Sequence, residues 1–140
     1  MTKYVVDCSA VLRLAAEGFD DPGEHELLAP TLIRSQVLST LHEMVHRGEL
    51  PAEVATDRLA RVARIPMRLL GDSVLRRTAW KLADEHGWAS TYNAEYLALT
   101  KLQGDALITL DDELAGRANG VVAVAAIDDL LTARRPAGSK

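Results

Sequence analysis

The chain has 140 residues, of which 48% are apolar and 26% charged, a composition typical of one globular domain. Its net charge of −4 argues against a protein that coats nucleic acid non-specifically. No apolar run approaches the roughly 18 residues of a membrane span, and a single cysteine, Cys8, rules out an internal disulfide and suits a reducing cytoplasm.

The first half of the chain alternates short apolar runs with stretches of helical periodicity. The predicted elements are a strand over 3–6, a helix over 10–17, a strand over 25–28, a helix over 32–47, a helix over 51–64 and a strand over 65–70. Ser9 and Thr31 are the expected N-caps of the first two helices, which end at Gly18 and Gly48. Pro66 prevents the third helix from continuing.

The second half continues the alternation. The predicted elements are a helix over 74–86, a helix over 92–102, a strand over 106–109, a short helix over 111–118, a strand over 121–125 and a helix over 127–133. Asp72 or Ser73 caps the first of these helices, and Ser90 or Thr91 caps the second. A single domain over 1–133 and a loose tail over 134–140 are expected.

Short apolar strands that alternate with amphipathic helices predict an α/β fold with a short, mainly parallel central sheet flanked by helices. Functional sites in such sheets lie at the carboxyl ends of the strands. Asp7 ends the first predicted strand, and Asp111 follows the strand over 106–109. If these two strands are neighbours, the two carboxylates meet at one edge of the sheet.

Two carboxylates held close together repel each other unless a cation lies between them. Mg2+ and Mn2+ prefer oxygen ligands, and a bound divalent cation can activate water and hold a phosphate oxygen, as in metal-dependent nucleases. Asp7 and Asp111 could instead be plain helix caps, or belong to a receiver or phosphatase domain. A haloacid-type phosphatase has a second acid two residues after the first, where this chain has Ser9.

The segment His42-Glu43-Met44-Val45-His46 matches the H-E-x-x-H pattern, in which two histidines on one helix face hold zinc and the glutamate acts as base. In the extended pattern a glycine and a third histidine follow, but Glu49 and Ala52 occupy those positions. The apolar positions of this helix are Leu38, Leu41 and Val45. Two surface histidines near a helix end are therefore favoured over a zinc peptidase site.

Residues 51–90 carry seven basic and five acidic side chains, a net charge of +2 between two acidic flanks. Four arginines recur here at near-helical spacing: Arg58, Arg61, Arg64 and Arg68. Three more cations lie on the next predicted helix: Arg76, Arg77 and Lys81. The first set could grip RNA phosphates, or it could be a solvated helix face paired with Glu53 and Asp57. Aromatic side chains are not expected among the cations, since Trp80 and Trp88 are assigned to the core or to a hinge.

Four sequence blocks cover nearly the whole chain. They are YVVDCSA at 4–10, APTLIRSQV at 29–37, TYNAEYLAL at 91–99 and LITLDDELA at 107–115. In this order they resemble the blocks of PIN domains, specifically of the VapC-type toxins of bacterial toxin–antitoxin pairs. The resemblance is most specific in the third and fourth blocks, whose usual forms are Y-D-A-x-Y-x-A-L-A and L-V-T-x-D-x-x-L-A.

The resemblance implies a three-layer α/β/α PIN-like fold, an Mg2+- or Mn2+-dependent endoribonuclease, a homodimer, a VapB-like antitoxin partner and a bacterial cytoplasmic location. It assigns family acids to Asp7 and Asp111, with Asp7 as the central ligand that bridges the metal and the attacking water. Ser9 would support Asp7, and Asp112 would be an auxiliary acid.

Two positions depart from the family pattern. Gln36 stands where the family usually has glutamate, and Asn93, at a metal-binding position, stands where it has aspartate. Both amides are near-isosteric with the acids but lack the charge that holds a hard cation. Glu43 lies two helical turns beyond Gln36, too far to replace it directly, and Glu95 points to another side of its helix.

The leading hypothesis is a ribonuclease toxin whose RNA cleavage is weakened or abolished by Asn93. The alternative is a catalytically silent PIN module that holds an antitoxin or RNA. Asn93 is either native to a degenerate nuclease or a laboratory Asp→Asn change made to spare the expression host. An aspartate at this position would make the net charge −5.

Overall fold

A five-stranded parallel sheet lies at the centre of residues 1–133, the part of the chain that the structure, a computed structural model, describes. The tail predicted over 134–140 lies outside the described residues. The strands are β1 (Lys3–Val6), β2 (Glu26–Pro30), β3 (Arg68–Leu70), β4 (Ala106–Ile108) and β5 (Val124–Ala125). Their order across the sheet is β3-β2-β1-β4-β5, and every neighbouring pair is parallel.

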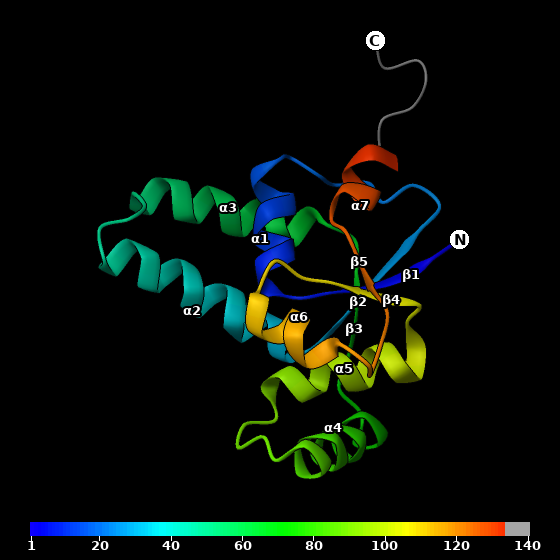
Figure 1. The fold of residues 1–140 in the computed structure, drawn as a ribbon. Coiled ribbons are helices and arrows are strands. Elements are labelled where there is room, and N and C mark those ends of the chain that lie inside the picture. The colour runs from blue at the N-terminus through cyan, green and yellow to red at the C-terminus, as the bar shows by residue number, and fades with distance from the viewer. Residues whose placement is uncertain (134–140) are drawn as a thin grey trace.

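Helices cover both faces of this sheet (Figure 1). They are α1 (Cys8–Ala16), α2 (Leu32–His46), α3 (Ala52–Arg64), α4 (Ser73–His86), α5 (Tyr92–Gln103), α6 (Asp112–Ala118) and α7 (Asp128–Ala133). Helices α1, α2, α3 and α7 share one cluster of buried apolar side chains, and α4, α5 and α6 share a second. The predicted α/β/α architecture is confirmed. No helix within the described residues is long and apolar enough to cross a membrane.

Strand β1 occupies the centre of the sheet, between β2 and β4. Because successive residues of a strand point to opposite faces, Tyr4 and Val6 enter the cluster that α1, α2 and α3 cover, while Val5 enters the cluster of α4, α5 and α6. Both valines are fully buried. The apolar strand expected over 106–109 is likewise confirmed, at Ala106–Ile108, where it is buried on both faces.

The expected start of the first helix is wrong by two residues. Asp7, not Ser9, is the N-cap of α1, because its backbone is extended and its side chain accepts the N–H of Ala10 at 2.9 Å. Ser9 already lies inside the helix. Thr31 stands at the N-cap of α2 as expected, but its side chain makes no capping hydrogen bond.

The last predicted strand is shorter and more exposed than expected. A buried strand over 121–125 was predicted, but only Val124–Ala125 pairs with β4, and the side chain of Val124 is 47% exposed. The N–H groups of Val121 and Val122 both donate to the carbonyl of Ala118, at 2.9 and 3.1 Å. These bonds continue the end of α6 into a turn and remove the two amides from the sheet.

Trp80 is not a core residue, contrary to expectation. Its side chain is 71% exposed, while Trp88 is half-buried against the cluster of α4, α5 and α6. The face of α4 that enters this cluster is made by Leu75, Ala79, Leu82 and Ala83. Trp80 points away from this face because it follows Ala79 by about 100° of helical rotation. Leu38, also expected on an apolar face, is 57% exposed on α2.

Replacing Asp72 by alanine is expected to destabilise the protein by about 1 kcal/mol, because the side chain of Asp72 caps α4. It accepts the N–H of Leu75 at 2.9 Å, whereas Ser73 is the first residue of the helix and makes no such bond. Urea unfolding of Asp72→Ala and of the matched control, Ser73→Ala, shows which of the two side chains caps α4. An equal or larger loss in the Ser73→Ala variant would contradict this assignment.

Candidate functional site

The carboxyl ends of β1 and β4 bring two acids to one edge of the sheet. Asp7 follows β1 directly, and Asp111 is the N-cap of α6, three residues after β4 ends. The strands are neighbours, with Val6 opposite Ile108. The expected meeting of the two carboxylates is confirmed, because both line a single open cavity of about 490 Å³ at this edge.

Asp7 is held by three hydrogen bonds inside this cavity. Its Oδ1 accepts the hydroxyl of Ser9 at 2.7 Å and the N–H of Ala10 at 2.9 Å, and its Oδ2 accepts the hydroxyl of Thr109 at 2.5 Å. Burial raises the pKa of Asp7, these bonds oppose the rise, and the charge of Asp111 adds to it. A carboxylate only 5% exposed is thus kept in place by protein donors on both oxygens.

Two hydroxyl groups tie the loop after β4 to the start of α1. The Ser9 Oγ accepts the N–H of Leu110 at 2.9 Å while it donates to Asp7. The Thr109 Oγ1 accepts the N–H of Asp111 at 3.0 Å while it donates to Asp7. Ser9 therefore contacts Asp7 as predicted. Thr109 was not predicted as a site residue, although it stands directly between the buried strand and the acids.

Gln36 lines the cavity from α2, where its amide oxygen is already engaged. The Tyr96 hydroxyl of α5 donates to Gln36 Oε1 at 2.5 Å. Tyr96 is 2% exposed, and burial raises its pKa, as do the charges of Asp7 and Cys8, so that the hydroxyl stays protonated and donates. The amide NH2 of Gln36 has no hydrogen bond to another described residue. Tyr96 was missed as a site residue, although it matches the second tyrosine of the Y-D-A-x-Y form that the third block resembles.

Asn93 lies outside the lining of this cavity. It sits in the first turn of α5, and its Nδ2 donates to Glu113 Oε1 of α6 at 3.4 Å. Glu113 is bound to Asp111 only through its backbone, whose N–H donates to Asp111 Oδ1 at 2.8 Å. Asp112 also lies outside the lining. The structure therefore brings Asp7, Ser9, Gln36 and Asp111 together and leaves Asn93 and Asp112 outside the lining.

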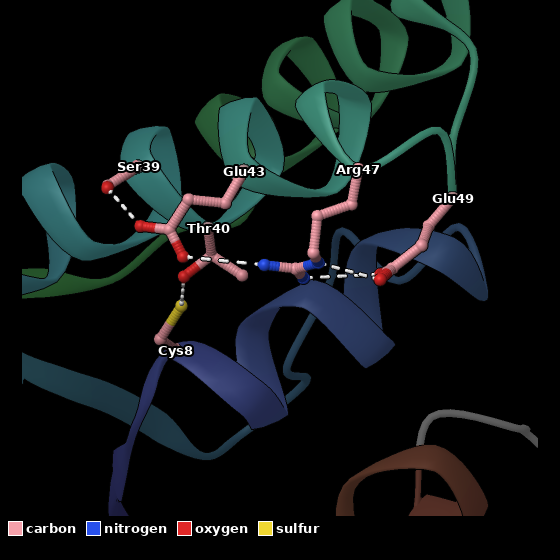
Figure 2. Close-up of polar contacts among 6 residues, drawn as sticks. All are labelled: Cys8, Ser39, Thr40, Glu43, Arg47 and Glu49. Carbon is pink, nitrogen blue, oxygen red and sulfur yellow. Dashed lines mark hydrogen bonds and ion pairs between the residues drawn. The ribbon is translucent and has the colours of Figure 1, made fainter.

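Glu43 belongs to the cavity, although sequence spacing placed it too far from Gln36. Its carboxylate accepts the hydroxyl of Ser39 at 2.7 Å and lies 3.9 Å from the Arg47 guanidinium, which is bound in turn to Glu49 at 2.6 Å (Figure 2). One face of α2, formed by Gln36, Ser39, Thr40 and Glu43, lines the cavity over two helical turns, so the helix runs along the cavity rather than across it.

The zinc pattern on α2 does not form a site. His42 and His46 are both exposed, as expected for surface histidines. Among residues 1–133 no three His, Cys, Asp or Glu side chains are grouped so that they could hold a metal ion. Cys8, next to Asp7, only donates to the hydroxyl of Thr40 at 3.6 Å (Figure 2), and burial raises the pKa of its thiol.

The residues present do not match the donor set that Mg2+ or Mn2+ requires. Such ions take several oxygen ligands, with carboxylates supplying the charge. Three carboxylates line the cavity here, Asp7, Glu43 and Asp111, but they are not grouped so that they could hold a metal ion. Asp7 already accepts hydrogen bonds on both oxygens, and Glu43 is bound by Ser39. The amide oxygen of Gln36 is occupied by Tyr96. We therefore assign no chemical step in this chain to a metal ion.

The arginines of α3 and β3 lie apart from the cavity, since none of them lines it. Arg61 pairs with Asp57 at 2.9 Å, and Arg68 lies 3.9 Å from Glu26. Arg58 and Arg64 form no ion pair with a described residue. Of these arginines, Arg61 therefore has the partner, Asp57, that a solvated and ion-paired helix face predicts.

No protein-family model and no curated protein matches the chain. Among solved structures, the chain is similar to the crystal structure of PAE2754 from Pyrobaculum aerophilum, with a TM-score of 0.71 and 24% sequence identity. The match covers 94% of this chain and 96% of that chain. At this identity the similarity shows a shared fold.

Proposed function

We propose that this chain is a VapC-type PIN-domain protein, the toxin of a type II toxin–antitoxin pair, whose endoribonuclease site is weakened in the present sequence. The proposal depends on one observation above all: Asp7 and Asp111 line one cavity at the carboxyl ends of neighbouring parallel strands, with Gln36 beside them. The four sequence blocks support it, and they also support a VapB-like antitoxin, RNA and a second copy of the chain as partners.

The two amides account for the weakening. A carboxylate at 36 would face the Tyr96 hydroxyl, and a carboxylate at 93 would lie 3.4 Å from Glu113, a distance at which two negative charges need a cation between them. The amides fill nearly the same volume, hydrogen-bond to these neighbours and need no cation. Asp7 and Asp111 line the cavity, so that two of the four carboxylates usual in the family are present and the other two are replaced by amides.

Restoring aspartate at 93 tests the enzymatic proposal. The Asn93→Asp variant is expected to cleave single-stranded RNA with Mg2+ or Mn2+ at a rate at least about tenfold above the native chain, since changes around a metal site typically alter activity 10- to 100-fold. Cleavage is followed on labelled RNA by gel, with EDTA as the metal-free control. The matched control is the double variant Asp7→Asn, Asn93→Asp, which should lose the gain completely.

The second candidate function is a catalytically silent module that binds antitoxin or RNA without turnover. Two observations favour it: the three hydrogen bonds that the carboxylate of Asp7 already accepts, and the absence, among the described residues, of any group of three metal-binding side chains. If Asn93→Asp cleaves no RNA, even combined with Gln36→Glu, while RNA or antitoxin still binds tightly, this second function replaces the first.

A further inference from the structure

A hydrogen bond between two helices joins Tyr96 and Gln36 at the wall of the cavity. Tyr96 lies on the buried face of α5 and is 2% exposed, and Gln36 lies on α2, 60 residues earlier in the chain. The Tyr96 hydroxyl donates to Gln36 Oε1 at 2.5 Å, and both side chains line the cavity. Position 36 is therefore oriented by a residue outside its own helix.

The buried phenol fixes the direction of this bond. Burial raises the pKa of Tyr96, and the charge of Asp7 raises it further, so that the hydroxyl keeps its proton. Gln36 Oε1 accepts this proton, and the Tyr96 hydroxyl has no other hydrogen-bond partner among the described residues. With the amide turned the other way, the buried O–H would have no acceptor, which is unfavourable. The structure therefore selects one of the two orientations of the Gln36 amide.

This orientation decides which atom Gln36 offers to the cavity. An amide carries its oxygen and its NH2 group on opposite sides of one carbon, so that the side turned away from Tyr96 carries NH2. This NH2 group has no hydrogen bond to another described residue. It donates hydrogen bonds and cannot bind a cation. A carboxylate at the same position would accept the Tyr96 hydroxyl on one oxygen and keep the second oxygen for a cation.

Glu43, the acid that α2 contributes to the cavity, does not replace this oxygen. Its carboxylate accepts the Ser39 hydroxyl at 2.7 Å and lies 3.9 Å from the Arg47 guanidinium (Figure 2). The positive charge of Arg47 competes with any cation for Glu43. The α2 wall therefore presents a hydrogen-bond donor at position 36 and an acid that already has two partners at position 43.

We propose that Tyr96 is a positioning residue that excludes a divalent cation from position 36, because it keeps the only oxygen of the Gln36 side chain turned toward itself. The same hydroxyl would favour a cation if position 36 were glutamate, since a partner that binds one oxygen of a metal ligand orients the other. The mismatch between the cavity and Mg2+ or Mn2+ thus results from the pair Tyr96 and Gln36 together. The inference rests on the proposed function, because only a metal-dependent site gives this exclusion an effect on activity.

Mn2+ binding to four chains tests the proposal: the native chain, Tyr96→Phe, Gln36→Glu and the double variant. Binding is followed by water-proton relaxation, which detects weak as well as tight Mn2+ complexes. Tyr96→Phe should tighten Mn2+ binding by the native chain about 2- to 12-fold, the bias that one hydrogen bond imposes on the amide. In the Gln36→Glu background the same change should weaken binding at least about tenfold, because it removes the partner that orients the carboxylate.

Opposite signs in the two backgrounds distinguish a positioning role from a structural one. A general disturbance of the cavity by Tyr96→Phe would act alike on the native chain and on Gln36→Glu. Effects of the same sign, or an unchanged Mn2+ affinity in the native background, would therefore overturn the proposal.

A spectroscopic measurement tests the orientation without metal. The side-chain NH2 signals of Gln36 are assigned by NMR in the isotope-labelled native chain, from their absence in Gln36→Glu. Tyr96→Phe should move both signals toward the shifts of a solvent-exposed glutamine. Tyr92→Phe is the matched control and should leave them in place, since Tyr92 is 57% exposed on the same helix and its hydroxyl has no hydrogen bond with a described residue.

Unchanged Gln36 signals in Tyr96→Phe would also overturn the proposal. Neither measurement uses RNA, so failure here is distinguishable from failure of the Asn93→Asp cleavage test.

Discussion

The double variant Gln36→Glu, Asn93→Asp is expected to bind Mg2+ or Mn2+ at least about 100-fold more tightly than the native chain. A factor of about 10 for each restored carboxylate is the lower end of the effect of substitutions around metal sites. A carboxylate at 36 would line the cavity with Asp7 and Asp111, and one at 93 would lie in the first turn of α5 beside Glu113 of α6. Isothermal titration calorimetry with MgCl2 and MnCl2 measures the affinity directly, without any dependence on RNA.

Stability provides an independent measurement on the same variant. Without metal the double variant should unfold at a lower temperature than the native chain, because the carboxylate at 93 replaces a hydrogen bond to Glu113 with a repulsion. Metal at 100 times its Kd should restore about 2.7 kcal/mol. Gln103→Glu is the matched control, since Gln103 lies exposed at the other end of α5 and should acquire no metal dependence. Equal metal responses in both variants would contradict a metal site at the cavity.

Replacing Asp7 by asparagine is expected to stabilise the metal-free protein by roughly 0.5–2 kcal/mol, the usual gain when an unfavourable functional group is removed. The carboxylate of Asp7 is buried and has no cationic partner among the described residues, so that burial of its charge destabilises the folded state. An asparagine keeps the oxygen that caps α1, and the hydroxyl of Thr109 can turn to accept from its amide.

The gain in stability from Asp7→Asn should be larger at neutral pH than at acidic pH. Burial raises the pKa of Asp7 above its ordinary value of 3.8, so the folded chain binds this proton more tightly than the unfolded chain. Native stability therefore falls as pH rises through the window between 3.8 and the raised pKa. Thermal unfolding should show the largest difference between variant and native chain at neutral pH and a shrinking difference as pH falls toward 4.

Asp111→Asn is the control for this pair of effects. Asp111 is exposed, and it caps α6 through bonds from Glu113 and Leu114, which an asparagine can also accept. Its replacement should raise the unfolding temperature much less than Asp7→Asn does, because it removes only the charge of Asp111, the smallest of the causes that act on Asp7. A destabilised Asp7→Asn variant, or a gain that grows on acidification, would show that the buried carboxylate stabilises the fold.

The layers of the fold and the pairing of two acids could be predicted because both depend on backbone periodicity. Apolar runs over 3–6 and 106–109 mark strands buried on both faces, and strands that are parallel neighbours end at the same edge. That rule alone brings Asp7 and Asp111 together, without any knowledge of side-chain conformation.

The rest of the site could not be predicted because it depends on how elements are tilted against each other. Asn93 bonds to Glu113 rather than to a cavity residue because of where α6 lies beside α5, and Glu43 reaches the cavity because α2 runs along it. Trp80 is a different case. The helical period of Leu75, Ala79 and Leu82 marks the inner face of α4, so its outward position was available from the sequence.

The strand order has a consequence for folding during synthesis on the ribosome. β1 is synthesised first but needs β4 on one side, and the N–H of Asp7 bonds to the carbonyl of Ile108 across that pair. Until β4 and α6 have been made, a nascent chain lacks Thr109 and Asp111 and leaves one edge of β1 open. Such long-range pairing forms late in folding. The two acids of the cavity therefore come together only when β1 and β4 pair, late in folding.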